Sequence, residues 1–495
     1  MPTRPMTPVD AAWYHMDGPA NLALVTGILL TRQPLDFERV KAVYTRRLAG
    51  FERFRQRVVE STLGLSTPHW EDVPGFEIDQ HLHHVALPAP HDRRALTDLI
   101  SDLASTPLDR ELPLWQVHVV DGVDGGSALI MRFHHCIGDG TAMMALSQVL
   151  FDTSPDAPLG EPPAAPADAE SGLLDRLLAQ ALGTIGWSTK AVLSTVDAAV
   201  GAFNNPQKAM EKAQIVLAGA GMLVGELLKT PDPESPLKGE FGMKKRVAWS
   251  DPVALDAVKE IGKRYGAKVN DVLAAGMTGA LRHYLARRGV EVDHITVRAM
   301  VPVDLRPPER GLDLGNDFGL VVLELPIGSR GPVKRLQATR ASMDALKRSP
   351  EALAIKTLFN IFGRGPKLIE DLAVDLFGSK ASVVLTNVPG PRQTLHLAGV
   401  EIDRIMFWVP HPGKQLGMGI SILSYRGSAS LAVIADANLV PDPETITQQF
   451  NREFVAMLKA ARRPRVSNPA DAPARAPARR TPRRRKRTAG ETPAA

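Results

Sequence analysis

Short apolar runs and helically spaced apolar residues alternate along most of this chain, a pattern typical of an α/β protein. The spacing predicts helices over residues 37–48, 96–103, 255–265, 271–287 and 446–458. It predicts strands over residues 116–121, 128–133, 295–301, 320–325, 382–385, 418–423 and 428–434. We also expect a helix to start at Thr7-Pro8. With 495 residues, of which 44% are hydrophobic, the chain can bury a large core.

Two histidines and an aspartate stand where one predicted buried strand ends. The apolar run of residues 128–133 leads into His134 and His135, and the turn residues Gly138-Asp139-Gly140 follow. Helically spaced apolar residues resume at Met143. Loops held by a buried scaffold often carry chemistry, so this stretch is the main candidate site.

Histidine is suited to proton transfer, because its ordinary pKa of about 6.5 lies near neutrality. One histidine could take the proton of a hydroxyl, thiol or amine that attacks an activated acyl group, while the other and Asp139 orient it. The alternative is a pair of structural histidines beside an Asp-Gly turn. A metal site is not expected here, because adjacent histidines on a strand point to opposite faces.

Two further candidates have simpler structural explanations. Asn270 is predicted to be the N-cap of the helix from Asp271 to about Arg287. A helix N-terminus can also stabilise an oxyanion, so both interpretations of Asn270 stay open. Cys136 is the only cysteine, which excludes an internal disulfide; we interpret it as a small buried residue rather than a nucleophile. Four histidines (His69, His81, His83 and His84) lack the spacing of a metal site.

The organisation of the chain follows from changes in composition. We expect an N-terminal lobe over residues 1–153, a Pro/Ala-rich linker and apolar helical crossover over 154–240, a C-terminal lobe over 241–461 and a basic disordered tail over 462–495. The crossover residues 171–229 either pack on the body or contact a membrane. No uncharged apolar run of about 18 residues exists, so no membrane span is expected, and no secretory signal is expected in residues 1–17.

The positive net charge of +5 comes from the tail. Residues 462–495 hold eleven basic and two acidic residues, a net charge of +9, so the rest of the chain carries −4. A basic nucleic-acid surface on the body is therefore not implied. The tail itself could contact an anionic membrane, stay solvated or contact nucleic acid.

Several stretches together resemble a known family. His134-His135-x-x-x-Asp139-Gly140 resembles the signature of the acyltransferases that depend on CoA or carrier proteins. The stretches that narrow the resemblance to bacterial wax ester synthase/diacylglycerol acyltransferases are Pro107-Leu-Asp-Arg-Glu-Leu-Pro-Leu-Trp115, Val269-Asn-Asp-Val-Leu273, Asn387-Val-Pro-Gly-Pro391 and Ser424-Tyr-Arg-Gly427. The likeness is collinear from about Pro8 to Lys459.

This resemblance implies two lobes like those of chloramphenicol acetyltransferase, with the active site in a channel between them. It implies transfer of a long-chain acyl group from acyl-CoA to a fatty alcohol or a diacylglycerol. His135 would be the general base, with His134 and Gly140 supporting the loop. Asn270 and Asp271 would be site residues, and Asp139 would pair with Arg306. Trp115 would have a structural role at the wall of the site.

The resemblance implies no cofactor, since acyl-CoA is a substrate. We expect a cytoplasmic protein with peripheral contact to membrane or lipid inclusions, and no specific nucleic-acid partner. Two alternatives stay open. One is a related CoA- or carrier-dependent acyltransferase or condensation enzyme with another acceptor. The other is a catalytically silent lipid-droplet or membrane-associated protein.

Overall fold

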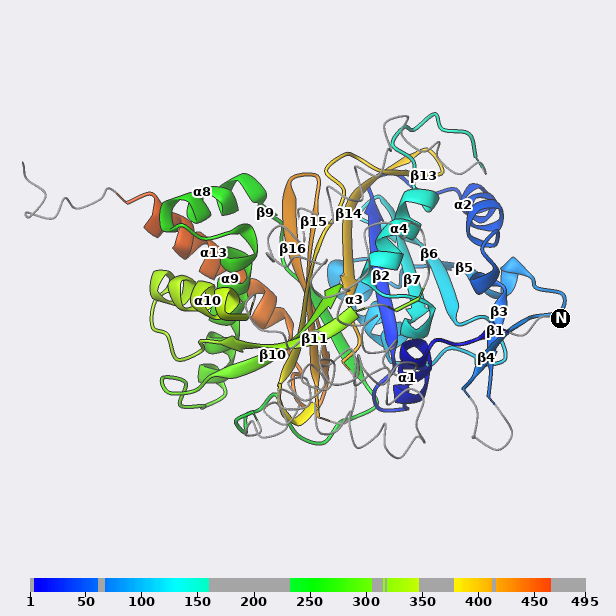
Figure 1. Ribbon diagram of the computed structural model, residues 1–495. Coiled ribbons are helices and arrows are strands. Elements are labelled where there is room, and N and C mark those ends of the chain that lie inside the picture. Colours follow the sequence, from blue (N-terminus) through cyan, green and yellow to red (C-terminus); the bar gives the residue numbers. More distant parts are fainter. Residues whose placement is uncertain are drawn as a thin grey trace, which may run out of the picture. The chain divides into compact units, whose positions relative to one another are not determined.

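Two mixed β-sheets with helices around them form the part of the chain that carries the predicted motifs (Figure 1). The computed structural model describes residues 4–60, 67–159, 232–304, 315–316, 318–346, 378–411 and 415–463. The expected crossover helices of residues 171–229, Arg306 and nearly all of the tail lie outside these residues.

The first sheet holds the strand of the His-His motif at its centre. Its order is β13 (His396–Leu397), β14 (Val400–Trp408), β2 (Leu24–Thr31), β7 (Gly126–His134), β6 (Trp115–Val123) and β5 (Leu82–Ala86). Strand β7 pairs antiparallel with β2 and β6 and is buried along nearly its whole length, as its apolar run predicts. The helices of this half are α1 (Pro8–Met16), α2 (Phe37–Val43), α3 (Arg93–Ala104) and α4 (Gly140–Leu150). A small sheet of β1 (Arg4–Pro5), β4 (His69–Asp72) and β3 (Gln56–Val59) accompanies them.

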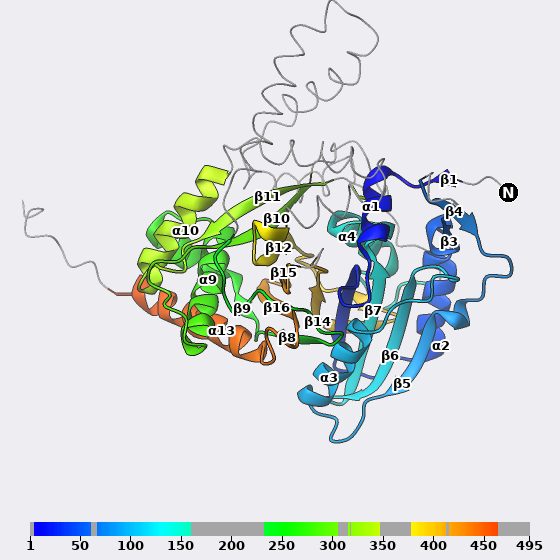
Figure 2. The same cartoon turned by 90° about the horizontal axis from the view of Figure 1, so that it is seen from below.

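The second sheet comes from the C-terminal half. Its order is β11 (Phe318–Leu325), β10 (Val297–Asp304), β12 (Val383–Pro389), β15 (Met418–Tyr425), β16 (Ser428–Asp436) and β8 (Lys245–Trp249), with β9 (Val253–Ala254) beside β16. The predicted hairpin is confirmed as β15–β16, whose turn places Arg426 and Gly427 at positive φ. Its helices are α8 (Leu255–Tyr265), α9 (Val269–Arg287), α10 (Pro332–Leu346) and α13 (Glu444–Ala461). Figure 2 shows α9, α10 and α13 on one side of this sheet.

One segment of the expected C-terminal lobe lies in the first sheet. Strands β13 and β14 fall within residues 241–461 yet belong to the first sheet, where β14 pairs antiparallel with β2. Alternate residues of β14, among them Met406 and Trp408, are buried. Pairing with β14 covers an edge of β2 that would otherwise expose unpaired backbone groups. The second half of the chain therefore completes the sheet that carries the motif.

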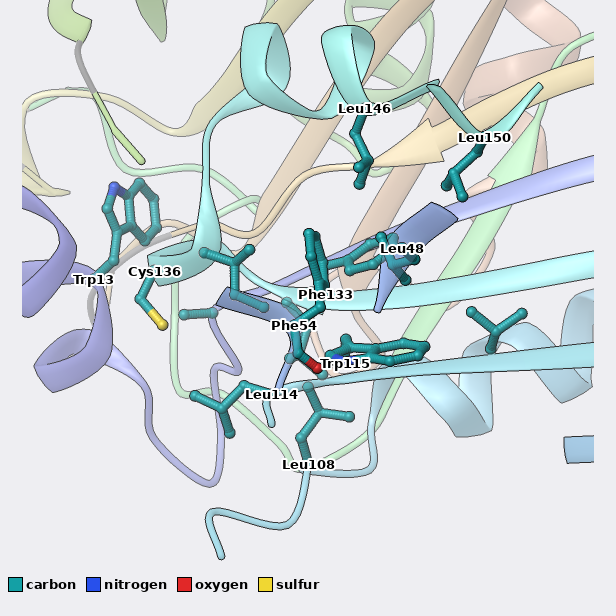
Figure 3. Close-up of a cluster of buried hydrophobic side chains, with 14 of the residues drawn as sticks. Trp13, Leu48, Phe54, Leu108, Leu114, Trp115, Phe133, Cys136, Leu146 and Leu150 are labelled. Carbon is teal, nitrogen blue, oxygen red and sulfur yellow. Dashed lines mark hydrogen bonds between the residues drawn. The ribbon is translucent and has the colours of Figure 1, made fainter. Parts of the chain in front are cut away.

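Buried aromatic residues anchor the core beneath the motif. Trp115 is fully buried and donates its indole N–H to the Phe54 carbonyl at 3.0 Å, which confirms it as a core anchor. Figure 3 shows Trp115, Phe133 and Cys136 in this cluster, with Trp13 at its edge. A separate apolar cluster is shared by both sheets, where the Trp249 and Trp408 rings meet at 5.9 Å. The two sheets are thus fixed against each other by buried apolar surface.

Candidate active site

The motif loop begins at the end of β7 and ends at the start of α4. His134 is the last residue of β7, and residues His135–Ile137 form a 3-10 turn. Asp139 is the N-cap of α4, and its Oδ1 accepts a hydrogen bond from the Ala142 N–H at 3.0 Å. A capping carboxylate satisfies one of the free N–H groups of a helix start. This interaction fixes the far end of the loop.

His134 is held from two sides. Its Nδ1 accepts a hydrogen bond from the Cys136 N–H at 3.1 Å, and its Nε2 lies 3.8 Å from Asp17 Oδ2. Asp17 is itself fixed by the Ala23 N–H at 2.7 Å and by Arg110 at 3.1 Å. Burial alone would raise the pKa of Asp17, but His134 and these two donors hold that pKa below its usual value. The geometry therefore uses His134 to shape the turn.

His135 lies between aromatic rings. The Trp13 ring stacks on its imidazole with centroids 3.8 Å apart, and Phe318 lies edge-on at 6.0 Å. Burial is the main cause that lowers the pKa of His135 to about 3, and the neighbouring His134 acts in the same direction. The imidazole is therefore neutral near pH 7 and able to accept a proton.

A short segment of the C-terminal half fastens this loop. The Asn316 side-chain amide donates to the His135 carbonyl at 2.8 Å, and the Asp139 N–H donates to the Gly315 carbonyl at 3.3 Å. Asn316 in turn donates its side-chain amide and its backbone N–H to Asp10 Oδ1, at 2.8 and 3.0 Å. The motif loop thus bonds to residues that stand about 180 positions later in the chain.

Asp10 is a buried carboxyl on α1 that supports this arrangement. Burial raises its pKa, although the Arg53 guanidinium 3.8 Å from Oδ2 and the Asn316 donors lower it. The sequence predicts a helix start at Thr7, and the Thr7 hydroxyl accepts a hydrogen bond from the Asp10 N–H at 3.1 Å. Asp10 and Asn316 are not among the site residues that the sequence predicts. Nothing in a single sequence pairs these two positions.

The predicted N-cap role of Asn270 is wrong. Helix α9 begins at Val269, and the Asp271 Oδ2 accepts a hydrogen bond from the Lys268 N–H at 2.8 Å. Asp271 therefore satisfies the start of the helix, and Asn270 stands within its first turn. Asn270 Oδ1 accepts a hydrogen bond from the Asn387 side chain at 2.9 Å. This pairing links α9 to the end of β12.

Gly140 of the motif loop lies close to the end of β12, whose Asn387 contacts Asn270. A Cβ built on Gly140 would lie 3.9 Å from Val388 Cγ2, next to the residue that holds Asn270. The motif loop and the end of β12 therefore meet. The predicted pair of Asp139 with Arg306 lies outside the described residues.

Cys136 lies inside the motif but is fully buried. Burial raises the pKa of its thiol well above the usual value, with Asp10 acting in the same direction. The reactive thiolate is therefore disfavoured, in agreement with its interpretation as a small core residue.

The histidines of residues 69–84 have other partners than a metal. His81 Nδ1 lies 2.8 Å from the Trp115 carbonyl oxygen, and His84 Nε2 lies 2.7 Å from Asp121 Oδ2. Within the described parts of the chain, no group of three or more His, Cys, Asp or Glu side chains could hold a metal ion.

Comparison with known proteins identifies the family. The model of the wax ester synthase/diacylglycerol acyltransferase catalytic domain matches residues 6–273, and that of the family's C-terminal domain matches residues 314–458. The chain belongs to the wax ester synthase/diacylglycerol acyltransferase family. It is therefore an acyltransferase, and its function is the formation of wax ester or triacylglycerol. This activity requires an acyl donor and an alcohol or diacylglycerol acceptor.

Relatives of this acyltransferase match over nearly their whole length. A putative diacyglycerol O-acyltransferase of Mycobacterium tuberculosis is 26% identical, with 94% of this chain and 92% of the relative covered. A probable diacyglycerol O-acyltransferase of the same species is 26% identical over 93% of this chain and 97% of the relative. The sequence resemblance to the family is thus confirmed across the chain.

Solved structures confirm the expected two-lobe α/β fold. The wax ester synthase/diacylglycerol acyltransferase from Marinobacter aquaeolei VT8 has a TM-score of 0.65 at 21% identity, over 92% of this chain and 99% of that one. The first condensation domain of the calcium-dependent antibiotic synthetase has a TM-score of 0.55 at 16% identity, over 93% and 96%. In the described part of this acyltransferase, no helix is both long and apolar enough to cross a membrane.

Proposed function

We propose that this acyltransferase moves a long-chain acyl group from acyl-CoA to the hydroxyl of a fatty alcohol or a diacylglycerol, with His135 as general base. The observation that carries the proposal is the neutral, buried imidazole of His135, held where residues of both halves of the chain meet. A neutral imidazole can take a hydroxyl proton without first losing one of its own.

The reaction needs one proton carrier and no covalent intermediate on the protein. His135 takes the proton of the acceptor hydroxyl as its oxygen attacks the thioester carbonyl, which forms the C–O bond and a tetrahedral oxyanion. When the oxyanion collapses, the C–S bond breaks and the imidazolium returns the proton to the CoA thiolate. Ester and free CoA are the products. The buried thiol of Cys136 takes no part in this sequence.

The other predicted site residues have supporting roles in this proposal. Asn270, or backbone N–H groups near it, would donate to the oxyanion, and such donors contribute substantially to catalysis. Asn387 would fix the orientation of Asn270 through their hydrogen bond. Asp139 and Gly140 would shape the loop, and Asp271 would hold the start of α9. Acyl-CoA is a substrate here, so the proposal needs no cofactor.

The location that we propose is the cytoplasm, with peripheral contact to membrane or lipid inclusions, because the ester product and the alcohol or diacylglycerol acceptor are lipids. We expect no specific nucleic-acid partner. An acceptor other than an alcohol or diacylglycerol remains the competing candidate, because the fold is shared with a condensation domain.

The test is thiol release from palmitoyl-CoA by the purified protein, with hexadecanol and dioleoylglycerol offered separately. We expect release that depends on the acceptor, and a loss of about 10²–10⁴-fold in kcat for His135→Ala. A His135→Ala enzyme with near-normal kcat would remove His135 from the base role. Release only with amine or carrier-bound acceptors would favour a condensation-type activity. A protein that binds lipid droplets without turnover on any acceptor would be a silent coat protein.

A further inference from the structure

The His135 imidazole is packed closely against two aromatic rings. A histidine that acts as a base is commonly fixed by a hydrogen bond from its second ring nitrogen to a carboxylate or carbonyl. Among the described residues, Nδ1 of His135 is buried and makes no hydrogen bond of regular geometry, while the polar groups that act on the ring are its own main chain and the Asn316 side chain. Asp139 of the motif uses its Oδ1 to cap α4. Packing therefore takes a main part in orienting the ring.

Trp13 supplies the closest packing partner. The indole and imidazole planes are 16° from parallel with centroids 3.8 Å apart, so the two rings lie face to face. Phe318 meets the imidazole at 60°, which limits its rotation from another side. Figure 3 shows Trp13 beside the turn that carries Cys136, the residue after His135.

The helix that carries Trp13 is itself firmly held. Thr7 caps the start of α1, and Asp10, one turn before Trp13, accepts both hydrogen bonds from Asn316. Asn316 also holds the His135 carbonyl. The backbone of His135 and the helix that bears the indole are thus joined through one side chain. This fixes the distance between the two rings.

The charge that develops in the reaction makes this stacking chemically relevant. When His135 takes the acceptor proton, its ring becomes a buried cation. The face of an indole ring carries negative potential and attracts a cation, most strongly where water is excluded. A face-to-face indole therefore interacts more favourably with the imidazolium than with the neutral imidazole.

We propose that Trp13 is a positioning residue for acyl transfer, whose indole face orients the His135 imidazole and stabilises the imidazolium formed when the proton is taken. This inference rests on the proposed role of His135 as the base. It predicts that Trp13 acts on kcat, because the cation exists only after substrate is bound. A cation–π contribution of the usual size corresponds to about 3- to 30-fold in kcat.

The first experiment compares Trp13→Phe with Trp13→Met in the full-length enzyme. We expect Phe to retain kcat within about threefold, and Met to lower it about 10-fold or more with KM within about twofold. Trp249→Leu is the matched control, since Trp249 and Trp13 are both 4% exposed and Trp249 lies in the apolar cluster between the sheets. The control should lower thermal stability and leave kcat unchanged.

The second experiment keeps the shape of the side chain and changes only its electrostatics. Growth with fluorinated tryptophans replaces all six indoles and weakens the negative potential of their faces. We expect kcat to fall stepwise with the number of fluorines, and this trend to vanish in the Trp13→Phe background. The measurement stands even if Trp13→Met fails to fold.

The outcomes separate the two proposals. A wild-type kcat in folded Trp13→Met, or a kcat that does not change with the number of fluorines, would overturn the role of Trp13. If His135→Ala is inactive in the same assay, His135 still stands as the proposed base. Equal losses in Trp13→Phe and Trp13→Met would assign the effect to the indole N–H, which has no described partner, and would also overturn the proposal. An active His135→Ala enzyme would instead show that the proposed base is wrong.

Discussion

Asn316 donates a hydrogen bond of 2.8 Å to the main-chain carbonyl of His135. The donor lies between strands β10 and β11 of the second sheet. The acceptor directly follows β7 of the first sheet. Both groups are buried, so the bond is not in competition with water. The motif loop therefore takes its final form only when the two halves have packed together.

Removing this donor should impair catalysis more than the fold. Asn316→Ala leaves the carbonyl of His135 without its donor and the carboxylate of Asp10 with only the backbone N–H of residue 316, which costs about 1–3 kcal/mol in the free energy of unfolding. A displacement of the loop by even 1 Å can lower kcat by about 10²-fold. Steady-state kinetics and denaturant unfolding of the same variant measure both effects.

Asp10→Asn is the matched control for this prediction. The variant keeps an oxygen that can accept both hydrogen bonds from Asn316, so kcat should stay within a few-fold of wild type. A normal kcat in Asn316→Ala, or equal losses in both variants, would mean that this bond does not control the position of His135.

The pair of Asn270 and Asn387 allows the oxyanion role to be tested. If Asn270 donates to the oxyanion, Asn270→Ala should lower kcat by about 10²–10³-fold with little change in KM. Asn387→Ala removes only the group that orients Asn270, at 2.9 Å, and should have a smaller effect. Asn270→Ala with lowered thermal stability and normal kcat would identify a purely structural residue.

Buried histidines should make the protein sensitive to acid. Burial lowers the pKa of His118 to about 3, and His83 and Arg132 act in the same direction. The folded state then binds fewer protons than the unfolded state, whose histidine pKa is about 6.5, so stability is complete above pH 6.5 and is lost as the pH falls from 6.5 toward 3. The loss is about 1.4 kcal/mol per pH unit for each such histidine.

His118→Leu should therefore flatten this dependence. The variant removes one proton-uptake site, and its free energy of unfolding should fall less steeply between pH 6.5 and pH 4.5 than that of wild type. His135 and His411, whose pKa values burial also lowers to about 3, keep a residual slope. Urea unfolding at several pH values gives both slopes; identical slopes would show that His118 titrates normally in the folded protein.

A buried ion pair of the second half, which also contacts the first half, should contribute strongly to the free energy of unfolding. Lys245 Nζ lies 2.7 Å from Asp436 Oδ2 and 2.6 Å from the Ala20 carbonyl, and both charged side chains are almost fully buried. Lys245→Met leaves the carboxylate of Asp436 without its counter-charge, which should cost about 3–5 kcal/mol in the free energy of unfolding.

The exposed pair of Lys259 and Asp256 provides the comparison. Their nitrogen–oxygen distance of 2.9 Å resembles that of the buried pair, yet both side chains face water. Lys259→Met should cost less than about 1 kcal/mol. Equal destabilisation by the two substitutions in chemical denaturation would contradict the assigned importance of Lys245.

Local patterns in the sequence determined much of the secondary structure and the motif loop. Residues 128–133 are buried in β7 because an apolar run bounded by turns has one stable environment, and Thr7 starts α1 through its own side chain. Where neighbouring residues offered similar chemistry, the prediction was wrong. Asn270 and Asp271 are both capable of satisfying a helix start, and the carboxylate of Asp271 does so, which moves the helix start two residues earlier.

Tertiary structure alone decided which distant segments meet. The pairing of β14 with β2 joins residues about 370 positions apart, and Asp10, Asn316 and His135 converge from three separate segments. Each of these side chains is unremarkable in its own stretch of sequence, because capping and periodicity act over only a few residues. Their contacts arise from sheet pairing and burial, which depend on the whole chain. The sequence thus determined the motif and its family, while packing of the two halves decided how His135 is held.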